Sequence, residues 1–388
     1  MAHRLAFGLA ALVLLASRPS SASTLPSDLC PPAHDPCIVT GTRMLGTDED
    51  IDFGDRTLLF ERVKMYWTGN LTLRARRIEL SLGDKIIERA TTPTGAGMLT
   101  LMCDSADIRG DILNVGSGVL MEDFDGVANA VNPGSTFTGK IQVKDDQQSF
   151  IGINSFGPIT FGAKVKTKAK GPTPYPAQFV VVSTLGDVTV TEKAQIKLRR
   201  AVADPATELV WLEAPSGTLT VDGLVDARAT AGAWAFDFEA DGDVGFGPKS
   251  KVIATGKNGH AQVGINSQSG SVALHGRVLA SSNAQITDPN GIGVCAAGDI
   301  TVDAAAQLVE KSGSGGVLVF GAGGQVTVGT AVKGAKVQLN KDSGDVEICG
   351  DGGVTIAPGS SLVPAPAALG SGCLSATSPT QFDLDCNH

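Results

Sequence analysis

Four lysines occupy alternating positions in one short segment: Lys164, Lys166, Lys168 and Lys170. Side chains two residues apart on a β-strand point to the same face, so these ammonium groups form one cationic stripe if the segment is a strand. A cationic stripe attracts anionic ligands. The alternative is an ordinary solvated strand face before the loop at residues 171–176.

Acidic residues gather in several turns, where carboxylate oxygens have the chemistry of Ca²⁺ ligands. The clusters comprise Asp48, Glu49, Asp50, Asp52 and Asp55; Asp241 and Asp243; and Asp342, Asp345 and Asp351. None has the spacing of an EF-hand loop or of the glycine-rich calcium repeat. Aspartates that hydrogen-bond within their own turns are the competing explanation. A calcium-binding surface module is therefore kept as an alternative.

Catalytic side chains do not occur in a recognisable arrangement. The five histidines are His3, His34, His260, His275 and His388, and they lack metal-ligand spacing. No histidine is a plausible partner for a serine nucleophile, so serine chemistry lacks its base. No Gly-x-Ser-x-Gly motif occurs either. No catalytic, cofactor-binding or metal-binding residue is assigned, and the balance leans against an enzyme.

Two short motifs match functional patterns only in their letters. Residues 291–296 read G-x-G-x-x-A, but this nucleotide fingerprint works between a strand and a helix, and here another strand follows. The triplet Arg109-Gly110-Asp111 has the form of an integrin-binding motif, and it fits a strand corner. We therefore assign no ligand to either motif.

The elements that carry these residues recur along the chain. Each repeat has a glycine followed, directly or after one or two residues, by a short alternating apolar strand, with a second strand about ten residues later and a third before the glycine. The repeats start at Gly69, Gly97, Gly134, Gly157, Gly186, Gly217, Gly242, Gly270, Gly298, Gly324 and Gly344. The first and last of these glycines are 275 residues apart over ten intervals, so the mean repeat is 27.5 residues.

This repeat predicts the fold. A strand with a period of two has one buried face, but a single repeat cannot bury three such faces against an ordering entropy of about 1–2 kcal/mol per residue. Stacking of successive repeats buries these faces and pairs the backbone groups. The sequence therefore predicts an all-β, right-handed parallel β-helix (solenoid) of about 11 rungs, capped at both ends, with positive φ angles at the turn glycines. An antiparallel β-sandwich is the competing fold.

The domain organisation follows from composition. Residues 1–22 are predicted to be a signal peptide, residues 23–50 a proline-rich N-terminal cap, residues 51–362 the β-helix, and residues 363–388 a C-terminal cap or tail. Proline cannot donate to a strand ladder, so it suits a cap better than a strand.

Seven cysteines are compatible with disulfides in an exported protein. Cys30 with Cys37, and Cys373 with Cys386, are pairs close in sequence, and each is a candidate disulfide within a cap. The pairing of Cys103, Cys295 and Cys349 stays open.

Export is predicted from the first residues. Arg4, an apolar run over residues 5–16 and small residues near Ala22 are typical of a secretory signal peptide. Cleavage after Ala22 is the assigned position, and cleavage after Ser23 fits nearly as well. Removal of residues 1–22 changes the net charge from −9 to −11, because two arginines and no acids are lost. This acidic balance argues against a nucleic-acid partner. With no later transmembrane segment in the sequence, we expect an extracellular, cell-surface or periplasmic protein.

With this repeat pattern, residues 50–362 resemble the right-handed β-helix surface proteins of bacteria, such as filamentous-haemagglutinin-type adhesins and autotransporter passengers. The resemblance rests on Gly-x-Val-x-Val strands followed by Ala-x-Val-x-Leu strands, as in residues 324–328 and 335–339. It implies an exported non-enzymatic protein with an adhesive or envelope-structural role, whose partner is a cell-surface polysaccharide or protein.

The alternative is a polysaccharide-acting enzyme of the lyase or hydrolase type, since such enzymes also use the β-helix. They need carboxylates, a base and aromatic sugar platforms in one groove. The tryptophans are scattered in the sequence and are not placed in one groove: Trp67, Trp211 and Trp234.

Overall fold

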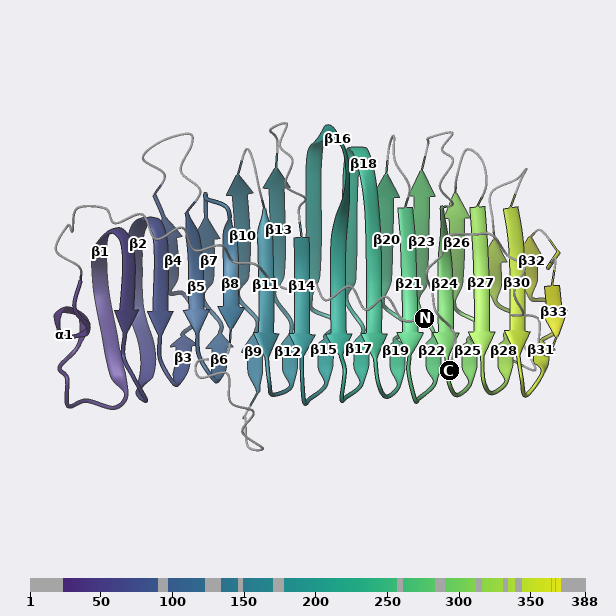
Figure 1. Cartoon of the computed structure of the whole chain (residues 1–388), viewed down its shortest axis with the longest axis horizontal. Helices are drawn as coiled ribbons and strands as arrows, with labels where there is room; N and C mark the ends of the chain where they lie inside the picture. Colours follow the sequence, from purple (N-terminus) through teal and green to yellow (C-terminus); the bar gives the residue numbers. More distant parts are fainter. Residues whose placement is uncertain are drawn as a thin grey trace, which may run out of the picture.

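Successive turns of the chain stack along one axis and pair in parallel, so the protein is an all-β parallel β-helix, as the sequence predicts (Figure 1). The structure, a computed structural model, describes residues 24–89, 97–122, 134–145, 149–169, 178–256, 261–282, 290–311, 316–330, 334–338, 344–363, 365–366 and 368–370. Equivalent strands of neighbouring turns form three faces that surround one apolar core.

The chain enters the β-helix through helix α1 (Pro26–Leu29) and two continuous strands, β1 (Cys37–Asp52) and β2 (Thr57–Arg74), each of which spans all three faces. Later turns are divided into shorter strands. The first face contains β3 (Arg77–Leu80), β6 (Ser105–Ile108), β9 (Ser135–Phe137), β12 (Ile159–Phe161), β15 (Val188–Val190), β17 (Leu219–Val221), β19 (Val244–Phe246), β22 (Val272–Leu274), β25 (Ile300–Val302), β28 (Val326–Val328) and β31 (Val354–Ile356).

The second face contains β4 (Lys85–Glu88), β7 (Asp111–Asn114), β10 (Lys140–Asp145), β13 (Lys164–Ala169), β20 (Lys251–Gly256), β23 (Arg277–Ser282), β26 (Gln307–Lys311), β29 (Lys336–Gln338) and β32 (Ser361–Val363). The third face contains β5 (Met98–Met102), β8 (Gly118–Glu122), β11 (Phe150–Ser155), β14 (Gln178–Ser183), β21 (Ala261–Ser267), β24 (Asn290–Ala296), β27 (Gly316–Ala322), β30 (Gly344–Gly350) and β33 (Ala368–Gly370). The long strands β16 (Gln195–Ala214) and β18 (Leu224–Ala240) belong to the second face at their start and to the third at their end.

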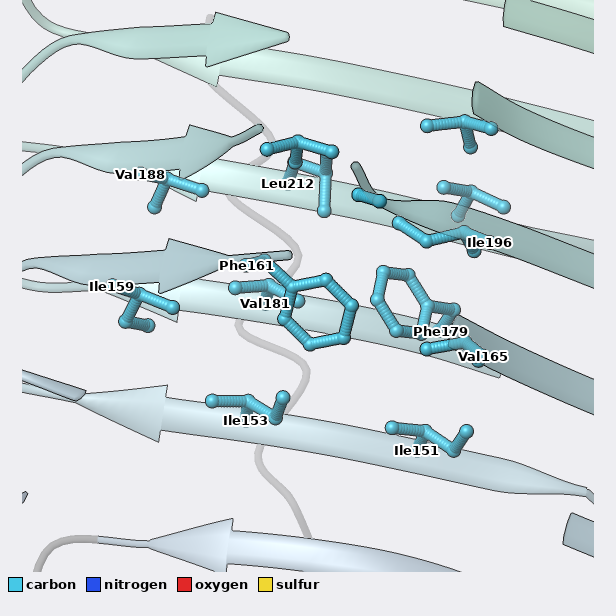
Figure 2. Packing of buried hydrophobic residues seen from close by; sticks show 14 of the residues in the cluster. Ile151, Ile153, Ile159, Phe161, Val165, Phe179, Val181, Val188, Ile196 and Leu212 are labelled. Atoms are coloured by element: carbon cyan, nitrogen blue, oxygen red, sulfur yellow. The ribbon is translucent and has the colours of Figure 1, made fainter. Parts of the chain in front are cut away.

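The core is built by the period-two pattern. In β15, Val188 and Val190 are buried, whereas Thr189 between them is partly exposed. The same register repeats in neighbouring turns, so each inward side chain packs on its equivalent above and below, as Figure 2 shows for the middle of the rod. The rings of Phe137 and Phe161 stack at 5.7 Å between centroids. Burial of each such side chain stabilises the fold by about 1.5–3 kcal/mol.

The prediction of positive φ at the turn glycines is wrong for several repeats. Gly69 and Gly134 do have φ angles of 74° and 78°, but Gly217 and Gly270 do not have positive φ. At Gly217 an added Cβ atom would collide with the carbonyl oxygen of Gly186 in the turn beneath. Glycine is required there because stacked turns approach closely, not because of backbone conformation.

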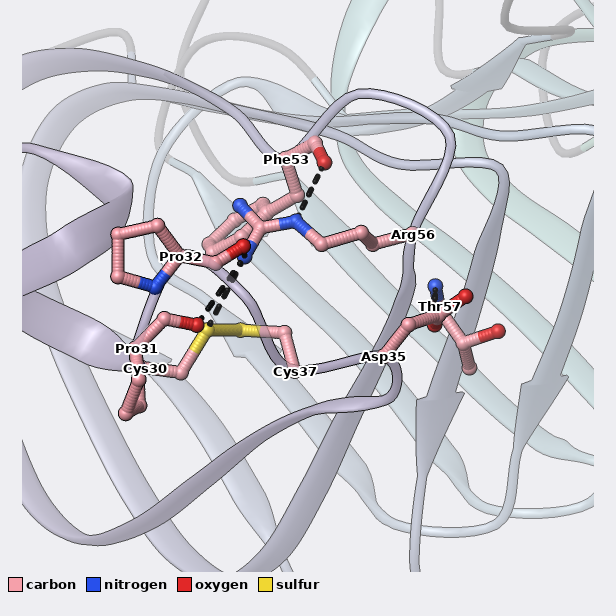
Figure 3. The surroundings of a disulfide bond; sticks show 8 residues. All are labelled: Cys30, Pro31, Pro32, Asp35, Cys37, Phe53, Arg56 and Thr57. Atoms are coloured by element: carbon pink, nitrogen blue, oxygen red, sulfur yellow. Dashed lines mark hydrogen bonds between the residues drawn. A yellow bond between two sulfur atoms is a disulfide. The ribbon is translucent and has the colours of Figure 1, made fainter.

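The predicted disulfide between Cys30 and Cys37 is confirmed, with 5.6 Å between the Cα atoms (Figure 3). Arg56 holds this region by donating from Nε to the carbonyl oxygen of Phe53 at 2.9 Å and from Nη1 to that of Pro32 at 3.2 Å. The disulfide and Arg56 therefore hold the segment before Cys37 against the start of the β-helix.

The β-helix begins earlier than expected. Strand β1 starts at Cys37, inside residues 23–50 that we assigned to the cap. From this residue onward, β1 already pairs in parallel with β2. The number of turns differs a little from the predicted 11. At the other end, strand β33 lies within the predicted C-terminal cap and pairs with β30 of the β-helix.

Several predictions lie outside the described residues, namely the signal peptide at residues 1–22 and the Cys373–Cys386 pair. Within the described part of the chain, none of the helices is both long and apolar enough to cross a membrane.

Candidate functional site

The predicted lysine stripe is confirmed on β13. Lys164, Lys166 and Lys168 are exposed, whereas Val165 and Thr167 between them are buried. The fourth predicted member, Lys170, lies outside the described residues.

Stacking widens this stripe into a two-dimensional surface. Lys168 pairs with Lys144 on β10 and with Arg199 on β16, and the pairing continues to Arg228 on β18. A second column runs from Gln142 through Lys166 and Lys197 to Asp226, and a third joins Lys140, Lys164 and Gln195. We call the cationic members the cationic patch: Lys140, Lys144, Lys164, Lys166, Lys168, Lys197 and Arg199.

The cationic patch is neutralised at one edge only. Asp226 is 4% exposed and accepts hydrogen bonds from Arg199 Nη2 at 2.7 Å and from Arg228 Nε at 2.8 Å. Among the described residues, no carboxylate lies within ion-pair distance of Lys144, Lys166 or Lys168. Asp226 therefore pairs with two arginines at this edge, whereas these three lysines have no such acidic partner.

A pocket of about 270 Å³ opens within the cationic patch. Its lining consists of Gln142, Val143, Lys144, Lys166, Thr167, Lys168, Lys197 and Arg199. Val143 and Thr167 are buried between the outward-facing residues of their strands, so they form the floor of the pocket. The site thus combines several cations with the amide of Gln142, which pairs with hydroxylated ligands.

A second cluster lies on the third face, where sequence reasoning did not place one. Trp211 of β16 pairs in register with Asp237 of β18, and Glu213 pairs with Glu239. Desolvation and, to a smaller extent, the charges of Glu239 and Glu213 raise the pKa of Asp237 to about 7. Desolvation also raises the pKa of Glu213. A carboxyl group with this pKa is suited to general acid–base chemistry near neutral pH.

This acidic cluster was not predicted from the sequence, because its signal is not the spacing of the three tryptophans. The signal is the spacing of polar residues by one repeat. Trp211-x-Glu213 and Asp237-x-Glu239 are 26 residues apart, close to the mean repeat, and this spacing was the available signal. Of the other tryptophans, Trp67 is buried in the core, and Trp234 lies on β18.

The acidic turns are used for hydrogen bonding within the fold. Asp187 Oδ1 accepts from the backbone N–H of Thr218 in the next turn at 2.8 Å, and Asp243 Oδ1 accepts from Ser271 N–H at 2.8 Å. Asp50 is paired with Arg74 at 2.9 Å. In the ranges that the structure describes, no group of three or more His, Cys, Asp or Glu residues is arranged to hold a metal ion.

The remaining motifs have structural positions. Residues 291–296 lie within strand β24, so the helix that a nucleotide fingerprint needs is absent there. Arg109 lies at a strand corner, as expected, and is paired with Asp107. His275 Nδ1 lies 2.8 Å from Asp303 Oδ2 in the next turn.

In comparisons with protein-family models, with curated proteins and with solved structures, none matches this chain. The function is therefore argued from the geometry alone.

Proposed function

We propose that this protein is an exported, non-enzymatic adhesive β-helix protein that binds an acidic cell-surface polysaccharide at the cationic patch. The observation that carries the proposal is the column Lys144–Lys168–Arg199, in which like charges face each other on neighbouring strands. Like charges directly opposite on a sheet are destabilising. An anionic ligand relieves this repulsion.

The patch is also local in a protein of opposite overall charge. The chain carries a net charge of −9, so nonspecific attraction of polyanions to the whole surface is weak. Ligand binding must therefore be confined to the region where the cations gather.

The chemistry of the patch favours an acidic polysaccharide over a nucleic acid. Gln142 and Gln195 stand in the same columns as the lysines, and amides pair with sugar hydroxyls as well as with carboxylates. Single-stranded nucleic acids are bound through aromatic side chains on which bases stack, and no aromatic side chain lines the pocket among the described residues.

The proposal is tested by measuring binding to an acidic polysaccharide, to a neutral polysaccharide and to DNA over a range of salt concentrations. We expect salt-sensitive binding to the acidic polysaccharide, and the double variant K166E/K168E lowers its affinity by about tenfold or more. The matched control is K251E/K336E, which reverses two exposed lysines of the same face outside the patch. Equal losses in the two variants, or tighter binding to DNA, would overturn the proposal.

The acidic cluster with Trp211 supports a second candidate function, a polysaccharide-acting enzyme. Its specific support is the raised pKa of Asp237 beside Glu239 and a tryptophan. Incubation with a panel of polysaccharides would release new reducing or unsaturated ends, and D237N would abolish this release. If the wild-type protein releases no new ends from any polysaccharide of the panel, the enzymatic candidate is rejected and adhesion remains the proposed function.

A further inference from the structure

The buried carboxylate of Glu49 binds the backbone at the start of the β-helix. Glu49 is 4% exposed. Its Oε2 accepts from the backbone N–H of Thr24 at 2.8 Å, and its Oε1 accepts from Thr24 Oγ1 at 2.9 Å and from Gly46 N–H at 3.0 Å. Both oxygens of one carboxylate are thus directed at a single residue, Thr24.

This carboxylate receives hydrogen bonds but no counter-charge. Within the part of the chain that the structure describes, no lysine, arginine or histidine side chain lies within ion-pair distance of Glu49. A buried charge is costly unless it is paired with an opposite charge. A cation at the position of Thr24 N would supply that pairing.

We infer that the Ser23–Thr24 peptide bond is the processing site of this protein and that the new N-terminus forms a buried ion pair with Glu49. The inference rests on the predicted signal peptide and is independent of the polysaccharide proposal. It moves the processing site one residue beyond the predicted position after Ala22.

The chemistry is hydrolysis by a signal peptidase. Water adds hydroxyl to the carbonyl carbon of Ser23 as the C–N bond breaks, and Thr24 leaves as an amine that is protonated at neutral pH. The resulting α-ammonium group occupies the place of an N–H that already lies 2.8 Å from Glu49 Oε2. The residues Ser21 and Ser23 supply the small side chains that a signal peptidase needs before the cleaved bond.

Cleavage after Ala22 would not give this contact. The ammonium group would then belong to Ser23, and Thr24 N would remain a neutral amide. The two cleavage positions therefore differ in whether the positive charge is held directly against Glu49.

The first test is to express the full chain in a secreting host and to determine the N-terminal residue of the exported protein by sequencing and intact mass. We expect Thr24. A different first residue, or export without cleavage, overturns the inference.

The second test is a stability cycle. Chains that begin at Thr24 or at Ser23 are prepared by cleavage of a removable tag, each with Glu49 or with Gln at position 49. We expect the Thr24 chain to melt about 1–4 °C higher than the Ser23 chain, and E49Q to remove this difference. The control E61Q changes an exposed glutamate of β2 and should preserve it.

The pH dependence gives a further readout of the same ion pair. Pairing raises the pKa of an amine above its ordinary value of about 8, so the advantage of the Thr24 chain is present at neutral pH and is lost as the pH rises above that value. An advantage that survives in E49Q contradicts the ion pair.

Discussion

Lys168 lies directly opposite Arg199 on the neighbouring strand, and both side chains leave the same face of the β-helix. Strands in a sheet are about 4.8 Å apart, so two cations are held close together by the register of the fold. A sequence selected for stability alone would place an acid at one of these positions. This relationship is the reason for assigning a ligand to the second face.

The first expectation concerns the energetic cost of this repulsion. We expect K168Q to increase the free energy of unfolding by about 0.2–1 kcal/mol at low salt, and the gain should shrink as salt screens the charges. Urea unfolding at two salt concentrations measures it. K336Q is the control, because Lys336 has a glutamine and a serine as ladder neighbours. A loss of stability in K168Q would show that the column is not repulsive.

The second expectation concerns Asp237. Between about pH 4 and pH 7 its carboxyl is protonated in the folded chain and ionised in the unfolded chain, because burial raises its pKa to about 7. The folded state binds the extra proton, so this group lowers stability as pH rises through that range. We expect D237N to raise the free energy of unfolding by roughly 2–4 kcal/mol at pH 8 and to change it little at pH 4. An effect independent of pH would rule out this titration.

The third expectation concerns the close approach of stacked turns. We expect G217A to lower the free energy of unfolding by about 1–3 kcal/mol, since its Cβ would collide with the Gly186 carbonyl oxygen. The matched control is G245A, where an added Cβ has no atom within 4 Å. Thermal or urea unfolding compares the two. Similar losses in both variants would contradict the steric explanation.

The fourth expectation concerns two disulfide-bonded cysteines on the third face, Cys295 and Cys349. They are in register with Gly321 between them. Two ladder steps separate their Cα atoms by about 9.6 Å, whereas disulfides need about 4.4–6.8 Å. These cysteines therefore do not bond to each other.

Peptide mapping without reduction measures this pairing. We expect no peptide that joins Cys295 directly to Cys349, and such a peptide would contradict the expectation.

The fold was predictable because its signal is repeated many times. Each short strand such as residues 188–190 is ambiguous alone, but the same apolar alternation returns at one period. Strand β1 was missed because its turn is irregular, with register shifts beside Gly41, Thr47 and Glu49. The repeat is therefore least visible in the sequence where the chain enters the β-helix.

The candidate site was predictable only along one strand. The alternation of Lys164, Lys166 and Lys168 gives their common face directly. Their neighbours Lys144 and Arg199 lie in other repeats, and placing them needs the register between turns, which loops of unequal length conceal. The pairing of Trp211 with Asp237 was not predicted for the same reason, because it also depends on the register between two turns.

The most direct test of the central claim is to map lysine reactivity on the folded protein with an amine-modifying reagent, with and without an acidic polysaccharide. We expect the polysaccharide to protect Lys144, Lys166, Lys168 and Lys197, while Lys251, Lys311 and Lys336 react at unchanged rates. Equal protection of the two groups, or protection only outside the cationic patch, would contradict the assignment of the ligand to this surface.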